Sequence, residues 1–398
     1  MKPLANFHVL DLTNVLSGPF CCHQLVHMGA KVTKVELPNT GDLARQLGAD
    51  AELNKNLMGI SFLAQNSGKR SITINLKSEK GKAVLKRLVL TADVLVENFR
   101  PGVMERLGIG YDVLSSINPQ LIYCAITGYG QDGPLRDNPA YDQIIQGMSG
   151  CMSITGSAET APYRVGYPMA DTIGGMTAAF AISSALANKD EDRGCKIDVS
   201  MLESVISTMG WVASNYLMAD KEPQPMGNEN FTASPSGTFA TADGDMNIAA
   251  NKQEQFEALC DVIGQPNLVI EPRFVNRQAR LEHRSELKKI IERSLRSKAA
   301  NVWIQLFNER GIPSGPVLTV PDALSHPQVA DRGLIGTFAD VPGVARDVRL
   351  VRSAIKLNDE AVCVDVPPPI LGQDTNSILS ELGYSEDEIK QLNKDKAL

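Results

Sequence analysis

The sequence predicts an α/β protein, with a mostly parallel sheet and helices on its faces. Three observations support this prediction. Short β-prone runs alternate with helical segments from His8 to Ile126, and such alternation is typical of parallel sheets. The chain has 398 residues, too many for one simple core, which indicates two domains or one large domain with an insertion. The composition also changes after residue 220, where a second domain is expected to begin.

The expected strands are short and alternate with helices along the chain. Residues 31–36 alternate as a strand does, and the apolar run at 121–126 is typical of a buried strand. Ligands of such sheets bind at the carboxyl ends of the strands, so the loops there are candidates for function. The strands are predicted at residues 8–12, 31–36, 93–97, 121–126 and 196–199, and helices at 18–29, 80–90, 172–187 and 201–218.

The second domain is predicted from a stretch of different composition. Residues 221–236 are rich in Pro, Gly and Asn, and we interpret them as a linker. A short β pair around Asp243-Gly244-Asp245 and charged amphipathic helices from 253 to 310 follow. Linker and small domain together are expected to span residues 221–325. The tail, 326–398, returns to short strands and ends in a helix after Ser385.

Charge and cysteine content limit the possible partners. A net charge of −7 argues against a broad nucleic-acid or membrane surface, although a local basic pocket is still allowed. The seven cysteines form no C-x-x-C pair, which fits reduced thiols in the cytosol better than disulfides or zinc. The longest apolar stretch has about 16 residues, whereas a membrane span needs roughly 20. We therefore expect a cytoplasmic protein without a membrane segment.

Several common enzyme motifs are missing. Glu36 ends the second strand where a ribose-binding acid would lie, but residues 12–19 contain no G-x-G-x-x-G loop for a dinucleotide. His23 and His27 have the spacing of a metal pair, yet neither an H-E-x-x-H pattern nor a third ligand is evident. There is no G-x-S-x-G for a hydrolase. We therefore expect no metal and no redox cofactor.

Asp171 is the candidate that the residues themselves bring forward. It stands in Gly-Tyr-Pro-Met-Ala-Asp-Thr-Ile-Gly-Gly, directly before a long apolar helix. One interpretation is an N-cap that satisfies the free N–H groups of this helix. The other is a nucleophile, because a helix N-terminus favours an ionised carboxylate and a carboxylate shielded from water can attack an activated acyl carbon. The residues alone leave both open.

Six segments, in order along the chain, add a resemblance. They are residues 10–19 (LDLTNVLSGP), 29–36 (GAKVTKVE), 69–72 (KRSI), 96–102 (VENFRPG), 128–134 (GYGQDGP) and 311–317 (GIPSGPV). These segments resemble the signature segments of the family III coenzyme A transferases (CaiB/BaiF family). That family includes formyl-CoA transferase, carnitine CoA-transferase and α-methylacyl-CoA racemase. The resemblance implies a Rossmann-like large domain formed by residues 1–220 and 326–398, an inserted small α+β domain, and an interlocked homodimer.

The resemblance also implies roles for individual residues. Asp171 corresponds to the catalytic aspartate, which would carry first a mixed anhydride and then an aspartyl-CoA thioester. CoA is then a co-substrate, and its phosphates need cations such as Lys77, Arg100 and Arg106. The positions that match CoA contacts of the family are Val15, Ile74, Asn75, Leu76, Lys77, Asn98, Phe99, Arg100 and Arg106.

The substrate is expected to be a short dicarboxylate, with succinyl-CoA as a possible donor. Residues 123–130 are similar to transferases that act on such acids, and Arg45 and Arg164 could each bind a distal carboxylate. The departures from formyl-CoA transferases are Leu37 and Pro139, in place of an arginine and a lysine, and a missing glycine-rich flap near 226–231. They argue against an oxalate-specific role.

Two alternatives remain. In α-methylacyl-CoA racemases a histidine shares proton transfer with the aspartate, and here Tyr141 stands in its place. Tyr141 is a poor base at neutral pH, since a tyrosine pKa is normally near ~10, and we count it among the substrate-binding candidates. The other alternative is a non-catalytic acyl-CoA-binding protein, in which Asp171 would have no chemical role.

Overall fold

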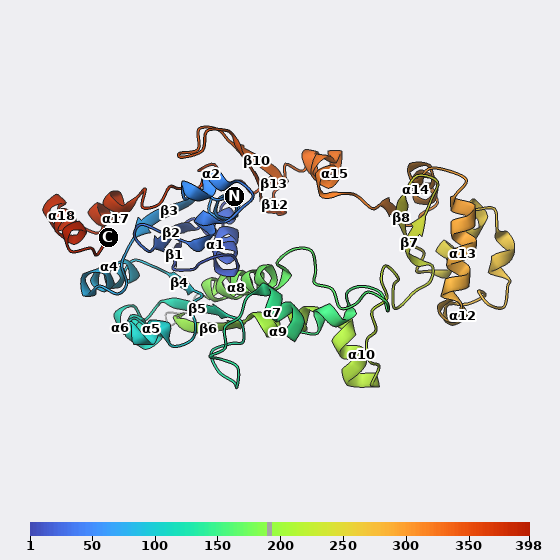
Figure 1. Ribbon diagram of the computed structural model, residues 1–398, viewed down its shortest axis with the longest axis horizontal. Helices are drawn as coiled ribbons and strands as arrows, with labels where there is room; N and C mark the ends of the chain where they lie inside the picture. The colour runs from blue at the N-terminus through green and yellow to red at the C-terminus, as the bar shows by residue number, and fades with distance from the viewer. Residues whose placement is uncertain (189–192) are drawn as a thin grey trace. The chain divides into compact units, whose positions relative to one another are not determined.

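The structure is a computed structural model that describes residues 1–188 and 193–398 (Figure 1). It divides into two compact units. The first unit comprises residues 1–151, 164–220 and 327–398, and the second comprises residues 152–163 and 221–326. This division differs from the expected domains chiefly at residues 152–163, which belong to the second unit although the sequence pattern places them in the first.

A six-stranded sheet forms the centre of the first unit, and all its neighbouring strands are parallel. The order β3-β2-β1-β4-β5-β6 reverses direction between β1 and β4, and ligands of such sheets bind at that switch point, beyond the carboxyl ends of the strands. The predicted α/β class is therefore confirmed. The strands are β1 His8–Asp11, β2 Lys31–Glu36, β3 Lys69–Thr73, β4 Val94–Glu97, β5 Ile122–Thr127 and β6 Cys195–Ser200.

Helices cover both faces of this sheet (Figure 1). Successive strand residues point to opposite faces, so Val9 packs into one core while Leu10 packs into the other. The first core includes residues of α1 Ser17–His27, α7 Asp142–Met148, α8 Met169–Ala187 and α9 Met201–Thr208. The second includes residues of α4 Glu79–Val89, α5 Val103–Arg106, α6 Tyr111–Ile117, α17 Thr375–Glu381 and α18 Glu386–Lys394.

The helix predicted at 201–218 is interrupted. The chain forms α9 and then α10 Trp211–Ala219, with Gly210 at φ 45° between them. A positive φ is tolerated by glycine but disrupts a continuous right-handed helix. The expectation of one helix is wrong at this residue. Among the helices of residues 1–188 and 193–398, none is both long and apolar enough to cross a membrane.

The rest of the first unit consists of short elements. They are η1 Leu43–Gln46, α2 Ala51–Lys55, α3 Ile60–Leu63, α16 Pro327–Asp331, β10 Ile335–Phe338, β11 Val348–Val351, β12 Lys356–Leu357 and β13 Glu360–Ala361. The short helix η2, Cys151–Ile154, spans the boundary between the two units.

The second unit has its own sheet and its own core. Its three strands are antiparallel in the order β7-β8-β9, and apolar residues of the sheet and of four helices form one cluster. The β pair and the amphipathic helices predicted for 236–310 are therefore present. The elements are β7 Ser236–Ala240, β8 Asp245–Ala249, α11 Gln253–Val262, η3 Pro266–Val269, α12 Arg277–Glu282, α13 Arg284–Leu295, α14 Ala300–Glu309, β9 Ser314–Pro316 and α15 Val320–Ser325.

Candidate active site

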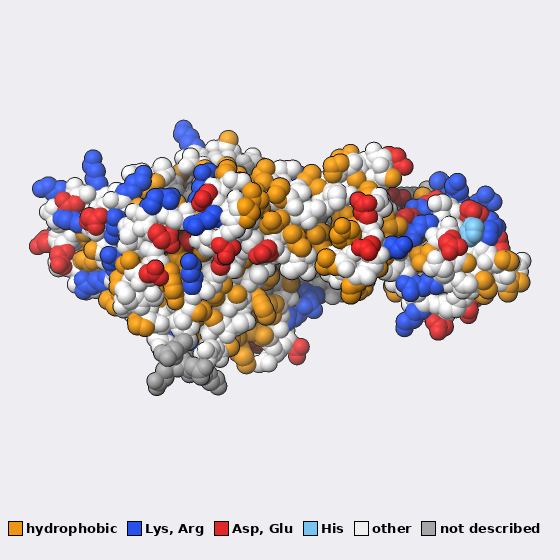
Figure 2. All heavy atoms as spheres, turned by 90° about the horizontal axis from the view of Figure 1, so that it is seen from below, with side chains coloured by type: hydrophobic (Ala, Val, Ile, Leu, Met, Phe, Trp, Pro, Cys, Tyr) orange, Lys and Arg blue, Asp and Glu red, His pale blue; other side chains and the backbone are white. Residues whose placement is uncertain are grey.

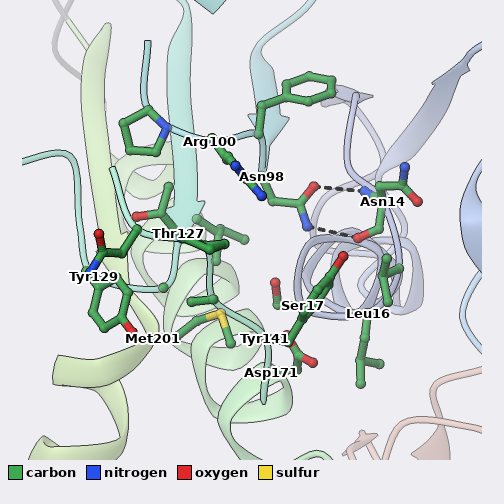
Figure 3. Close-up of a pocket in the computed structure, with 18 of the residues that line it drawn as sticks. Asn14, Leu16, Ser17, Asn98, Arg100, Thr127, Tyr129, Tyr141, Asp171 and Met201 are labelled. Atoms are coloured by element: carbon green, nitrogen blue, oxygen red, sulfur yellow. Dashed lines mark hydrogen bonds between the residues drawn. The ribbon is translucent and has the colours of Figure 1, made fainter. Parts of the chain in front are cut away.

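A pocket of about 270 Å³ lies at the carboxyl ends of the central strands of the first unit. The loops after β1, β4 and β5 form its walls, at residues 14–17, 98–101 and 127–129 (Figure 3). Asp171 of α8 and Met201 of α9 also line it, together with the segment 138–141. The pocket therefore lies where the topology of the sheet predicts a ligand.

Two asparagines join the walls on either side of the switch point. Asn98 accepts the backbone N–H of Asn14 (2.8 Å) and donates its amide to the Asn14 carbonyl (2.9 Å), as the dashed lines in Figure 3 mark. The Asn14 side chain in turn accepts the N–H of Leu43 (2.8 Å). These bonds fix the loop after β1 against the loop after β4.

The loop after β1 holds a residue in an unfavourable conformation. Val15 has φ 67°, a left-handed value that is rare for a β-branched residue and costs on the order of 1–3 kcal/mol. Its N–H is bound by the carboxylate of Asp42 (2.9 Å), and Asp42 is ion-paired with the buried Lys34 (3.0 Å). Strain of this kind persists only where the surroundings enforce it, so the loop has one defined shape at the pocket wall.

The buried charges beneath this loop compensate one another. Asp11 pairs with Lys69 (2.8 Å) and with Lys34 (3.8 Å), and all three side chains are inaccessible to solvent. Burial opposes ionisation of Asp11, but the two lysines outweigh it and lower its pKa to about 2. Lys34 also donates to the carbonyl of Thr13 (2.9 Å). The network forms a fixed base for the pocket wall.

The loop after β4 is anchored by a buried glutamate. Glu97 accepts the N–H of Phe99 (2.7 Å), and its other oxygen accepts the Tyr123 hydroxyl (3.2 Å). Burial raises the pKa of Glu97 to about 7. Phe99 and Arg100, which follow it, line the pocket.

Asp171 lies in the first turn of α8 but does not cap it. The helix begins at Met169, and the carboxylate of Asp142 accepts the N–H groups of Ala170 (2.8 Å) and Asp171 (3.4 Å) instead. The N-cap interpretation of Asp171 is therefore wrong, because a residue from α7 performs that function. This leaves the Asp171 carboxyl free to face the pocket (Figure 3).

The electrostatics of Asp171 also differ from the expectation. Burial, and secondarily the charge of Asp142, raises the pKa of Asp171 to about 7. The helix N-terminus was expected to favour the ionised form, but desolvation and a like charge act in the opposite direction. Asp171 thus titrates near neutrality, as acids and bases at catalytic sites often do.

Arg45, predicted to bind a distal carboxylate, lies away from the pocket and is completely buried. It forms a two-pronged ion pair with Glu36 (2.7 and 2.8 Å) and donates to the carbonyls of Leu57 (3.1 Å) and Pro369 (3.3 Å). It also stacks on the ring of Phe62 (3.6 Å). With these contacts Arg45 stabilises the fold and is not available to a substrate, which corrects the prediction.

The other two substrate-binding candidates lie closer to Asp171. Arg164 is half-exposed and forms an ion pair with Asp142 (3.7 Å), but it does not line the pocket in the described part of the chain. Arg164 is near Asp171 because both contact Asp142, which caps α8. Tyr141, 67% exposed, does line the pocket.

The candidate CoA contacts fall into two groups. Val15, Asn98, Phe99 and Arg100 line the pocket, whereas residues 74–77 and Arg106 do not. The side chain of Ile74 is buried in the second core and so is not available to CoA, and Asn75 is bonded to the carbonyls of Lys396 and Ala397. Lys77 and Arg106 are exposed.

Three functional candidates were missed by the sequence analysis. Ser17 and Arg136 line the pocket, and Asp142 controls the N-terminus of α8. Ser17 lies inside the segment at 10–19, and Arg136 is a cation two residues beyond the segment at 128–134. Position within or next to one of these segments was therefore the available signal for both. Asp142 belongs to the segment 139–142 that was compared with the racemases, but no sequence pattern indicates that it caps a helix that begins 27 residues later.

The structure shows what Glu36, His23 and His27, the residues considered for a nucleotide or a metal, contact instead. Glu36 is held by Arg45 and by the hydroxyl of Ser71 (2.8 Å), so it cannot bind a ribose. His23 bonds to the Ser67 hydroxyl (2.8 Å), and its ring contacts that of His27. Among the residues that the structure describes, no cluster of three or more His, Cys, Asp or Glu could hold a metal ion.

The first unit is a parallel α/β sheet with a pocket at its switch point. The pocket contains Asp171, whose raised pKa is typical of a catalytic carboxyl group, so fold and site together indicate an α/β enzyme. Comparison with known proteins identifies the family. The family described as CoA-transferase family III matches residues 4–375. The chain belongs to family III of the CoA-transferases and is an enzyme of this class.

Similar proteins cover nearly the whole chain. Succinyl-CoA:glutarate CoA-transferase of Mus musculus is 36% identical over 394 residues, 98% of this chain and 89% of that protein. Acetyl-CoA:oxalate CoA-transferase of Acetobacter aceti is 39% identical over 335 residues, 84% of this chain and 85% of that protein. The crystal structure of a CaiB/BaiF family protein from Brucella suis is 33% identical, with a TM-score of 0.82 over 96% of this chain and 99% of that chain. The family resemblance seen in the sequence is confirmed.

Proposed function

We propose that this enzyme transfers CoA from an acyl-CoA, such as succinyl-CoA, to a short dicarboxylic acid through covalent intermediates on Asp171. The position of Asp171 carries this proposal. Among the described residues that line the pocket, it is the one with a carboxyl group. A carboxylate held in a partly dry pocket is a nucleophile for an activated acyl carbon.

The reaction proceeds in four steps. The Asp171 carboxylate attacks the donor thioester, which gives a mixed anhydride and releases CoA thiolate. The thiolate attacks the aspartyl carbonyl, which gives an aspartyl-CoA thioester and releases the donor acid. The acceptor carboxylate then attacks this thioester, which gives a second mixed anhydride and expels CoA thiolate. The thiolate finally attacks the acceptor acyl carbon of this anhydride, which gives the acceptor acyl-CoA and releases the Asp171 carboxylate. Because burial raises the pKa of Asp171 to about 7, both its neutral and its ionised form are populated near neutral pH.

The pocket walls supply contacts for the reactive end of CoA. Phe99 and Val15 offer apolar surface, and Arg100 is an exposed cation at the pocket wall. A cation at this place suits a phosphate or a carboxylate. CoA is too large to fit into a pocket of 270 Å³, so most of it must lie outside. We therefore assign Lys77 and Arg106, which are exposed outside the pocket, as contacts of the adenosine phosphates. They remain predicted contacts.

The pocket chemistry and the relatives favour a dicarboxylate acceptor. The relative from mouse is named for succinyl-CoA and glutarate, and that from Acetobacter aceti for oxalate. Arg136 lines the pocket and is about half-exposed, with its neighbour Asp137 as its ion-pair partner (3.6 Å). Since Arg45 is buried, we assign the distal carboxylate to Arg136. A dicarboxylate and a monocarboxylate of equal chain length should then differ in KM; equal values would exclude this assignment.

Racemisation is less well supported by the pocket. Tyr141 lies where the racemases place a histidine, and none of the five histidines lines the pocket of the described chain. Proton removal from an acyl-CoA α-carbon needs a base whose pKa lies near the working pH. Deuterium uptake at that carbon without an acceptor acid would favour racemisation instead.

We also propose that the enzyme is a homodimer. The helix α10 has no buried residue and presents large apolar side chains to solvent, among them Trp211 (76% exposed), Leu217 (79%) and Met218 (83%). On the face seen in Figure 2, hydrophobic side chains lie exposed among charged ones. Exposed apolar surface of this kind is typical of a subunit interface, and a second copy of the chain is the partner that the family resemblance implies.

The test is an assay of succinyl-CoA against a panel of mono- and dicarboxylic acids, read by mass spectrometry, with hydroxylamine added to trap acyl-enzyme. The wild type should transfer CoA and acquire the trapped adduct at Asp171. Asp171→Asn should lose transfer by at least about 10³-fold and form no adduct. Asp112→Asn, which changes an exposed aspartate in the first turn of α6, is the matched control and should be fully active. Full transfer by Asp171→Asn would contradict the proposal.

A further inference from the structure

We propose that the hydroxyl of Ser17 is a catalytic hydrogen-bond donor, which stabilises the oxyanion that forms on Asp171 when CoA thiolate attacks it. This inference rests on the proposed function, because it requires an acyl group on Asp171. It assigns a chemical role to a side chain for which sequence and fold give none.

Ser17 and Asp171 share the same pocket. Ser17 is the first residue of α1 and only 3% exposed, yet it lines the pocket together with Asp171. Figure 3 shows the two side chains next to each other, Ser17 from the helix that follows β1 and Asp171 from α8. The small exposed part of Ser17 therefore borders the space that a substrate would occupy.

A close contact between helices sets this position. In α8, Asp171 and Gly175 are four residues apart and thus lie on the same face. A Cβ atom on Gly175 would lie 2.4 Å from the carbonyl oxygen of Ser17, so the backbones of α1 and α8 touch at this point. The turn of α8 that carries Asp171 therefore lies alongside Ser17.

The hydroxyl of Ser17 makes no hydrogen bond within residues 1–188 and 193–398, and its oxygen is accessible from the pocket rather than sealed in the core. Other buried serines of the first unit are bonded: Ser71 to Glu36 (2.8 Å) and Ser204 to the carbonyl of Ser200 (2.7 Å). The Ser17 hydroxyl is thus left with its hydrogen-bonding capacity directed at the pocket, where water or a ligand atom can accept its hydrogen bond. A ligand atom in the pocket would supply the missing acceptor.

The N-terminus of α1 is a second source of positive potential beside the Ser17 hydroxyl. Its N-cap is Leu16, which provides no side-chain hydrogen bond, whereas the N-terminus of α8 is capped by Asp142. The first N–H groups of α1 are thus left without a carboxylate cap. A helix N-terminus stabilises negative charge, and Ser17 stands at this end.

The step that Ser17 assists balances without any proton transfer. The thiolate sulfur forms a bond to the carbonyl carbon of Asp171 in the mixed anhydride, and the π electrons move to the carbonyl oxygen. Ser17 donates a hydrogen bond to this oxyanion and keeps its proton. The carbonyl then re-forms as the bond to the anhydride oxygen breaks, and the donor carboxylate leaves. Aspartyl-CoA thioester remains.

The test measures the rate at which CoA becomes attached to Asp171 after rapid mixing with succinyl-CoA, by acid quench and mass spectrometry. Removal of one oxyanion donor typically slows catalysis about 10²–10³-fold. We expect this loss in Ser17→Ala, with the KM for succinyl-CoA changed by less than about threefold, since the bond forms in the transition state. Ser204→Ala removes another buried hydroxyl, outside the pocket, and should keep the wild-type rate.

The outcomes separate the two proposals. A wild-type rate in folded Ser17→Ala, with the adduct on Asp171, would overturn the role of Ser17 and leave the proposed function standing. A wild-type enzyme without an adduct on Asp171 would overturn both. If thermal melting shows that Ser17→Ala does not fold, Ser17→Cys takes its place, because a thiol of similar shape is only a weak donor. A rate within threefold of wild type in that variant would equally exclude the donor role.

Discussion

At the scale of single residues, the pocket assigns different tasks to two aspartates. Asp142 accepts the N–H groups at the start of α8 and is paired with Arg164. Asp171 has no such partner in the described part of the chain, and burial next to a second carboxylate raises its pKa to about 7. The raised pKa means that the site destabilises the carboxylate relative to a neutral form. In the proposed reaction the carboxylate loses its negative charge when it forms the anhydride, so this destabilisation favours the attack.

The pKa of Asp171 predicts the pH dependence of the reaction. Only the carboxylate is nucleophilic, so kcat/KM should fall about tenfold for each pH unit below 7 and level off above it. Asp142→Asn removes the neighbouring charge but keeps an oxygen that can cap α8. The midpoint of the pH profile of this variant should therefore move to lower pH. It should stay above 3.8, the ordinary pKa of an aspartate, because burial is the larger cause of the raised pKa of Asp171. Profiles of kcat/KM against pH measure both values.

The control for this pH series is Asp112→Asn, which should reproduce the wild-type midpoint because Asp112 is exposed and outside the pocket. A midpoint for Asp142→Asn that stays in place or rises would contradict the assignment of the titrating group to Asp171.

The contrast between Asp171 and Arg45 illustrates what a sequence shows about single residues. The segment around Asp171 directs attention to it, and the structure places it in the pocket. Arg45 also appears as a free cation in the sequence, but Glu36 and the carbonyl of Pro369, 324 positions away, occupy its guanidinium. Likewise, the cap of α8 comes from α7. Partners that meet only in the folded chain decide these roles.

At the scale of elements, the contact between α1 and α8 governs the geometry of the site. Gly175 lets the two helices touch, because any side chain there would meet the backbone at Ser17. Gly174, next to it, faces the side chain of Met201, where an added Cβ would lie 2.8 Å from Cγ. A methionine side chain can move aside, whereas a backbone carbonyl cannot do so without shifting its helix.

This difference predicts distinct effects of two neighbouring substitutions. Gly175→Ala should lower the free energy of unfolding by about 1–2 kcal/mol, since overpacking outweighs the gain of about 1 kcal/mol in helix propensity. It should also lower kcat, because Ser17 and Asp171 move apart. Gly174→Ala, the matched control, should change both quantities much less. Urea unfolding and kcat for transfer measure them.

Equal losses in the two glycine variants would show that the α1–α8 contact has no special role. A destabilised Gly175→Ala with wild-type kcat would separate packing from the chemistry of the site.

Elements were predictable where burial leaves a simple pattern. The apolar runs of β1, β4 and β5 indicate their strands to within one or two residues, because both faces of a parallel sheet are covered. β3 is not among the strands predicted from the sequence. Its Lys69 and Ser71 point into polar contacts with Asp11 and Glu36, which hide the apolar pattern. The interruption at Gly210 depends on a backbone angle, which helical periodicity does not reveal.

At the scale of the whole molecule, both chain ends contribute to the first unit. Ile389 and Leu392 of the last helix pack into the same core as Leu10 and Leu95, and Ala397 near the terminus is fully buried. The carbonyl of Ala397 accepts the N–H of Asn75, which follows β3 (2.9 Å). The final residues are therefore part of the first unit.

Assembly is the remaining property at this scale, and α10 provides its test. A stable interface buries about 1,600 Å² with an apolar centre, and a charge inserted there is expensive to desolvate. The double variant Leu217→Glu/Met218→Glu should therefore sediment as a monomer, whereas the wild type should have twice that mass. Leu90→Glu, which alters another exposed leucine (60%) just after α4, should remain dimeric. If the subunits are interlocked, isotope-labelled and unlabelled dimers mixed together should also exchange subunits slowly, because a linked pair must partly unfold to separate. A wild type that sediments as a monomer, or a double variant with the wild-type mass, would exclude an interface at α10.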